Sequence, residues 1–520
     1  MPGYRSPGEP SAAWRRPLLA GPWVLHAVIL AVTLVAAVLM VRLPLVAGIG
    51  LVAGLAVFIA SFVNTNVGLC LVVLSMLLSP EIGAGALSGD SATTASRGVT
   101  VRAEDLLLVL LGFAWLAQMA VHKELGLVRR TPLNRPIAGY VVACLAATAI
   151  GVVTDRVSGV TGFFYVLKYV EYFVVYFVVA NYLEERTQIR RFLGLLLATA
   201  LVVILVAMAQ IPSGERMSAP FEGERGEPNT LGGYLLLVGA VVGGLLLNAP
   251  KAWQRWALGG FLAILAVPFL ATLSRGSYLA VPFVYLTLVA LERRRRTTML
   301  IAGVLLALAG AFALPSSVRE RVLYTFEQRT QAARVEVGGV RLDTSTSARL
   351  TSWQEAMEAA GDSPLWGLGV TGYGFLDAQY PRILVETGAI GMAAFLLLIG
   401  AILRLCLRVF RRAREPLDRG LAMGAVAGLA GLLVHAVGAN TFIIVRIMEP
   451  FWFVVGLVVT VDRLQASEPV GEPALVSEVE SGWPSTRRPN GAASRGDAAS
   501  EDAQGRGRIK SDPAHADAGR

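Results

Sequence analysis

Charged side chains are scarce in this chain of 520 residues: Asp, Glu, Lys and Arg together make up 16% of it, against about 25% in an ordinary soluble domain. That shortage excludes a soluble globular protein. The chain has only three cysteines, each inside an apolar run, which excludes a disulfide-stapled secreted domain. Hydrophobic residues make up 55% and the mean hydropathy is +0.59, as is typical of a polytopic membrane protein.

Apolar runs suited to crossing a bilayer occur along most of the chain. A bilayer core needs about 20 apolar residues per helix, and fourteen runs meet or approach that length. They cover residues 24–41, 44–62, 67–80, 104–121, 137–153, 161–180, 191–211, 231–248, 255–273, 277–291, 298–314, 388–410, 419–437 and 441–461. The sequence therefore predicts an all-α fold, a polytopic transmembrane helix bundle of about 12–14 spans. The run 24–41 is interpreted as a retained anchor, and 44–80 as two spans or as one span with a re-entrant piece.

Positive charge alternates from one predicted loop to the next. The basic segments are 122–136, 181–191, 251–255, 293–296 and 404–419. Cytoplasmic loops carry an excess of Lys and Arg, so these loops, and both termini, are predicted to be cytoplasmic. Most of the positive charges behind the net charge of +9 lie in these predicted cytoplasmic loops. Because they are spread over separate short loops, they do not form the continuous basic groove that a nucleic acid would need.

The opposite, outer side holds one long segment, about seventy residues at 315–387. A capping box of Ser317 and Glu320 predicts a helix as far as Glu336, and a second helix is expected from Arg349 to Ala360. The predicted organisation is a cytoplasmic N-terminus (1–23), the first part of the bundle (24–314), an outer loop domain that is mostly helical (315–387), the last spans (388–462) and a disordered cytoplasmic tail (463–520).

Arginines on the outer side break the charge rule and are therefore informative. Arg275 lies in a three-residue turn between two predicted spans, where the alternative is an arginine snorkelling to the interface. Arg225 is surrounded by three glutamates that could neutralise it, and Arg349 shares a helix face with Trp353. The guanidinium fork suits phosphate oxygens. These positions predict an anionic, phosphorylated substrate, such as a lipid headgroup or a lipid-linked diphosphate.

Ionisable groups also occur inside or beside predicted spans, where they are costly and usually face the bundle interior. Lys168 and Glu171 are three residues apart, which is compatible with a structural pair or with a ligand contact. Arg382 and Glu386 stand four apart and are expected to form a boundary ion pair. His435 is expected to be a helix–helix hydrogen-bonding group.

Several short motifs resemble those of the O-antigen ligase and polymerase family, in family order. They are Lys168-Tyr-Val-Glu171, Pro228-Asn229-Thr-Leu-Gly232, Ser274-Arg275-Gly276, Arg349-Leu-Thr-Ser-Trp353, Gly367-Leu-Gly369 and Tyr380 to Gly391. The resemblance covers about 160–460 and implies a metal-independent, inverting glycosyltransferase without cofactors in the bacterial inner membrane. Its donor would be a glycan on undecaprenyl diphosphate at the periplasmic face. Its acceptor would be a glycan or lipid, with chain-length regulator or flippase proteins as candidate partners besides membrane lipids.

The resemblance also assigns candidate site residues. Arg275 and Arg349 would hold the diphosphate, and Arg225, Asn229, Lys168 and Tyr380 are the further substrate-binding candidates. Ligases of the family commonly carry a histidine at the position of Asp377, so Asp377 or Glu386 is the candidate base.

Three functions stay open at this point. A polymerase of lipid-linked polysaccharide is slightly favoured over an O-antigen ligase, because the ligase histidine is replaced, and protein O-glycosylation is a minor alternative. A transporter or lipid-linked oligosaccharide flippase is disfavoured, because the chain has no matching halves.

Overall fold

The computed structural model describes residues 45–79, 103–121, 129–213, 216–220, 227–313, 336–337, 340–341, 344–374 and 376–467. These residues are mainly helical, with one short antiparallel hairpin of β1 (Glu336–Val337) and β2 (Val340–Arg341). The predicted first span, the capping box at Ser317 and the tail from 468 onward lie outside them.

Each of the thirteen predicted spans after the first corresponds to a helix in the described residues. The helices are α2 (Leu45–Val63), α3 (Thr65–Ser75), α4 (Ala103–Val121), α5 (Asn134–Val153), α6 (Gly159–Tyr182), α7 (Arg186–Met208), α8 (Pro228–Asn248), α9 (Ala252–Ala271), α10 (Arg275–Leu291), α11 (Arg296–Ala313), α14 (Gln379–Arg412), α15 (Pro416–His435) and α16 (Val445–Ser467). Eight of the helices are long and apolar enough to cross a membrane. The all-α polytopic fold is confirmed, and the chain is a multi-pass membrane protein.

Some boundaries differ from the prediction. The second outer helix, α13, spans Thr344–Ala360 and so begins five residues before Arg349. Glu336, the expected end of the preceding helix, lies in β1. The last helix continues past 463 to Ser467, because the Arg463 guanidinium donates to the carbonyls of Ala180 and Leu183 and holds this turn against α6.

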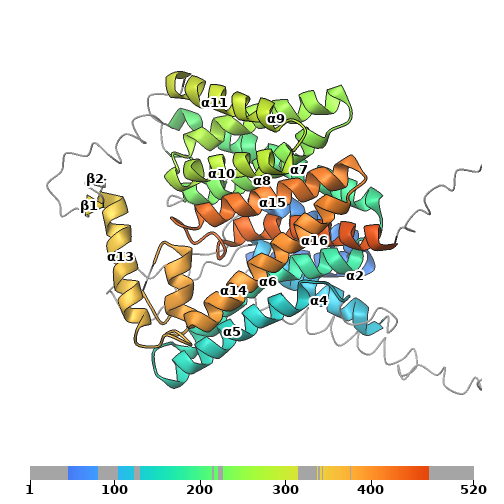
Figure 1. Ribbon diagram of the computed structural model, residues 1–520. Helices are drawn as coiled ribbons and strands as arrows, with labels where there is room; N and C mark the ends of the chain where they lie inside the picture. The colour runs from blue at the N-terminus through green and yellow to red at the C-terminus, as the bar shows by residue number, and fades with distance from the viewer. Residues whose placement is uncertain are drawn as a thin grey trace, which may run out of the picture. The chain divides into compact units, whose positions relative to one another are not determined.

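The contact between α8 and α15 forms the centre of the bundle (Figure 1). Both helices are largely buried, and glycines line their crossing. A Cβ at Gly244 would lie 2.4 Å from the Gly420 carbonyl oxygen, and one at Gly424 would lie 2.6 Å from Val241 Cα. The two backbones are therefore in direct contact, as small residues permit in membrane helices.

Gly424→Ala is expected to destabilise the bundle by about 1–3 kcal/mol, because the added methyl group would push α8 and α15 apart. Thermal unfolding of the full chain in detergent measures the effect. Gly400→Ala is the matched control, since nothing lies within 4 Å of a Cβ at Gly400 and alanine favours a helix more than glycine does. Equal unfolding midpoints for the two variants would contradict a backbone contact at this crossing.

The connections predicted to be cytoplasmic gather at one end of the bundle. Arg186 pairs with Asp418 at 3.2 Å, joining the starts of α7 and α15, and Arg129 pairs with Glu184. The opposite ends of α8 and α15 meet connections that the charge pattern assigns to the outer side. Which side of a membrane each end faces stays a prediction.

α14 bends at Gly388, where φ is 65°, a value that L-residues rarely adopt. A Cβ there would lie 2.3 Å from the Leu365 carbonyl oxygen. The Leu368 amide donates to the Val385 carbonyl (2.8 Å) and the Ala389 amide to that of Pro364 (2.8 Å). The bend is the docking point for the segment after α13. It separates an outer part of α14, which packs with α13, from the part that enters the bundle.

Candidate functional site

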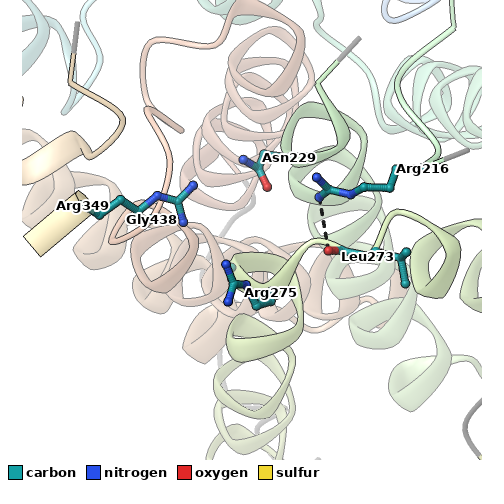
Figure 2. Close-up of a pocket in the computed structure, with 7 residues that line it drawn as sticks. Arg216, Asn229, Leu273, Arg275, Arg349 and Gly438 are labelled. Carbon is teal, nitrogen blue, oxygen red and sulfur yellow. Dashed lines mark hydrogen bonds between the residues drawn. The ribbon is translucent and has the colours of Figure 1, made fainter. Parts of the chain in front are cut away.

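A pocket of about 110 Å³ lies at the end of the bundle that the charge pattern assigns to the outer side (Figure 2). The residues that line it are Arg216, Asn229, Leu273, Arg275, Gly276, Arg349 and Gly438. They come from the segment 216–220, the start of α8, the α9–α10 turn, α13 and the α15–α16 turn. Three guanidinium groups from different elements point into it (Figure 2). No acidic residue is among these seven, so the described lining suits an anion.

The α9–α10 turn presents Arg275 as the first residue of α10. Ser274 is the N-cap: its Oγ accepts from the Ser277 amide and donates to Asn229 Oδ1 at 2.8 Å. Leu273 before it has a φ of 49°, a conformation that is costly for a branched side chain. The Ser-Arg-Gly motif is therefore a fixed helix start.

The start of α8 packs closely against this turn. A Cβ at Gly232 would lie 2.2 Å from Ser277 Oγ, so glycine is needed for α8 and α10 to approach, and this explains the Pro-Asn-x-x-Gly spacing. Asn229 is the second residue of α8, and Arg275 the first of α10. Two helix N-termini therefore meet the pocket, and their partial positive charges favour an anion there.

Arg216 is the lining residue that the sequence analysis missed. Its Nη2 donates to the Leu273 carbonyl at 3.2 Å, which ties it to the turn before Arg275. The charge pattern could have found it, because Arg216, like Arg225, lies between the predicted spans 191–211 and 231–248, on the predicted outer side. Arg225 itself lies outside the described residues.

Arg349 and Asp377 form an ion pair of 3.1 Å at the pocket, with 34% of each side chain exposed. The backbone around Asp377 is tied to the end of α15 and the turn after it. Asn440 Nδ2 donates to the Leu376 carbonyl (2.7 Å) and the Tyr380 hydroxyl to the Leu433 carbonyl (2.6 Å). The carboxylate at the position of the family's histidine thus contacts Arg349, which lines the pocket, and the Tyr380 hydroxyl holds the segment. Neither Asp377 nor Tyr380 is among the lining residues.

Glu386 has a different environment. It is 3% exposed and accepts from Arg382 Nε (3.1 Å), the Tyr169 hydroxyl (3.2 Å) and the Thr371 amide (3.3 Å). The expected pair with Arg382 is present. Glu386 is not among the lining residues, and its contacts join α6, α14 and the segment before α14.

Lys168 is also absent from the pocket lining. Its Nζ lies 3.2 Å from Glu171 Oε1 and 2.6 Å from Asp105 Oδ2. The expected pair with Glu171 is present, but Asp105 at the start of α4 is the nearer partner. His435 is fully buried, with its Nδ1 2.8 Å from Thr441 Oγ1.

Metal-ligand clusters give no further candidate. In the described parts of the chain, no group of three or more His, Cys, Asp or Glu side chains could hold a metal ion. The charged groups that line the pocket are three guanidinium groups, one of which, Arg349, is paired with the Asp377 carboxylate.

Comparison with known families gives a match for part of the chain, and comparison with curated proteins gives none. Residues 260–396 match the family described as O-Antigen ligase. That stretch contains Arg275, Arg349 and Asp377, whereas Arg216, Asn229 and Gly438 lie outside it. Over this region the chain resembles the O-antigen ligase family, and the match indicates an O-antigen ligase-type membrane enzyme.

Proposed function

We propose that this protein is a glycosyltransferase of the bacterial inner membrane that polymerises polysaccharide carried on undecaprenyl diphosphate, at the periplasmic face. The observation that carries the proposal is the convergence of Arg216, Arg275 and Arg349 on one pocket where two helices begin. A diphosphate is the group that such a set of donors suits best. The family match over 260–396 supports the same class.

The reaction proposed is a single displacement. A hydroxyl oxygen of the acceptor glycan attacks the anomeric carbon of the donor, and the bond from that carbon to the diphosphate oxygen breaks. Its electron pair leaves with undecaprenyl diphosphate, so the anomeric configuration inverts. Negative charge grows on the leaving diphosphate, and the guanidinium groups stabilise it where a divalent cation would otherwise be needed.

Asp377 is proposed to take the proton from the acceptor hydroxyl. Its ion pair with Arg349 holds the carboxylate beside the group that binds the diphosphate, and a carboxylate has further lone pairs for a hydroxyl donor. Positioning of donor and acceptor would supply much of the remaining acceleration. Glu386 is proposed to act through structure alone, because Arg382, Tyr169 and Thr371 already donate to it.

The alternative within this class is an O-antigen ligase that transfers the finished glycan to lipid A-core or to another acceptor. The description of the matched family favours the ligase, whereas Asp377 in place of the ligase histidine favours the polymerase. The proposed partners are the lipid-linked donor, the glycan or lipid acceptor and membrane lipids.

A deletion strain distinguishes the two on a polysaccharide gel. Loss of a polymerase leaves single repeat units attached to their final acceptor, whereas loss of a ligase leaves long polymer unattached. An unchanged gel pattern would contradict both. A flippase would instead give no transfer when the purified protein is supplied with lipid-diphosphate donor and acceptor.

A further inference from the structure

Arg446 is a fully buried arginine that the proposed reaction does not use. It is the second residue of α16 and is not among the residues that line the pocket. A buried guanidinium is tolerated only when its donors are bonded. Its contacts therefore indicate which segments it organises.

The Arg446 fork joins three segments that are far apart in sequence. Nη1 donates to the Pro220 carbonyl at 2.9 Å and Nη2 donates to the Ser79 carbonyl at 2.8 Å. Nε lies 3.7 Å from Glu104 Oε1 in the first turn of α4. A planar fork can reach two carbonyls at once, which the single ammonium of lysine cannot do in the same geometry.

Pro220 lies four residues after Arg216 of the pocket, within the described residues 216–220. Within the segment, the Met217 and Ala219 side chains are buried in the hydrophobic core. The Met217 amide donates to the Ala271 carbonyl at 3.3 Å, and Ser218 exchanges two 3.4 Å bonds with the Gln210 side chain. The bonds from Arg446 to Pro220 and Ser79 are shorter than these.

The same segment also contacts the turn that presents Arg275. Met217 bonds to Ala271, and Arg216 bonds to Leu273, so 216–220 lies along residues 271–273 just before the N-cap of α10. A displacement at Pro220 would be transmitted through the backbone to Arg216, four residues before it in the chain.

We propose that Arg446 is a positioning residue that holds segment 216–220 so that the Arg216 guanidinium reaches the pocket. The part that concerns donor binding rests on the proposed function. Arg446 acts through Arg216 and does not touch the substrate.

A double-mutant cycle tests the coupling, with undecaprenyl diphosphate as the probe and the purified full chain in lipid nanodiscs. Arg446→Lys is expected to weaken binding about tenfold in the wild-type background, and by less than about twofold where Arg216→Ala has already removed the group it positions. An equal loss in both backgrounds would overturn the proposal. Arg446→Gln, which keeps an amide donor, serves as a second variant if the lysine variant does not fold.

Arg463→Lys is the matched control. Arg463 lies at the other end of α16 and also donates to two backbone carbonyls, but it has no contact with segment 216–220. It is expected to leave undecaprenyl diphosphate binding unchanged in both backgrounds. An equal weakening by Arg463→Lys would mean that any loosening of α16 suffices, and would overturn the specific role of Arg446.

Hydrogen exchange at the Met217 amide provides a readout that needs no ligand. Arg446→Lys should speed exchange there and Arg463→Lys should not, because only the first releases Pro220. Unchanged exchange would overturn the proposal. If the wild type binds undecaprenyl diphosphate no better than undecaprenol, the proposed function is wrong, and exchange at Met217 still decides whether Arg446 holds the segment.

Discussion

Arg275→Ala should reduce glycan transfer by about 10²–10³-fold, the loss typical when a preorganised donor to a developing charge is removed. Arg275 begins α10 behind the Ser274 N-cap and lines the pocket, so the backbone that carries its guanidinium is held at the pocket before any substrate arrives. The measurement is polymer formed by purified full-length protein from a lipid-diphosphate donor. Binding of undecaprenyl diphosphate should weaken in the same variant, because the diphosphate is the group that Arg275 is proposed to contact.

Two further variants test whether the loss of transfer in Arg275→Ala is caused by the loss of the guanidinium group. Arg275→Lys keeps the charge without the fork and should recover only part of the activity. Arg156→Ala removes an exposed arginine from the connection between α5 and α6, at the same end of the bundle, and should leave transfer unchanged. Equal losses for Arg156→Ala and Arg275→Ala would point to general surface charge and contradict the pocket.

The sequence predicted part of the pocket because charge placement and local motifs are visible in one dimension. Arg275, Arg349 and Asn229 line it, and each belongs to a short motif or breaks the positive-inside rule. Arg216 belongs to no such motif, although it too is a positive charge on the predicted outer side. Its role depends on how segment 216–220 lies against the α9–α10 turn, which no local spacing reveals.

The carboxylates show the same limit. Sequence placed Asp377 and Glu386 nine residues apart as equal candidates for the base. The bend at Gly388 and the segment docked against it bury Glu386, whose carboxylate accepts three hydrogen bonds. Asp377 instead contacts Arg349 at the pocket. Long-range backbone pairing separates the two environments, and the local sequence carries little information about it.

The fold was more predictable than the site. A bilayer requires helices of nearly fixed length with apolar surfaces, so hydropathy alone located α8 and α15. The glycine contact between them is a property of two helices together. The start of α13 was misplaced because Thr344 to Ser347 is polar and contains no apolar periodicity, so a helix there gave no signal.

Asp377→Asn should lower the rate of transfer by about 10²–10⁴-fold, the contribution typical of a positioned general base. Asparagine keeps an oxygen that can accept from Arg349, so binding of undecaprenyl diphosphate should change little. Single-turnover transfer and equilibrium binding, measured on the same preparation, separate the two effects. Equal losses in binding and rate would indicate that Asp377 serves only to orient Arg349.

Glu386→Gln and Asp377→His complete this test. Glu386→Gln removes the buried negative charge that pairs with Arg382 and should lower the unfolding midpoint, while transfer per folded molecule stays near the wild-type value. Asp377→His supplies an imidazole whose unperturbed pKa is about 6.5; it should recover part of the rate lost in Asp377→Asn, rising as pH passes from about 6 to 7 and the imidazole becomes neutral. Retained transfer in Asp377→Asn together with lost transfer per folded molecule in Glu386→Gln would reverse the two assignments.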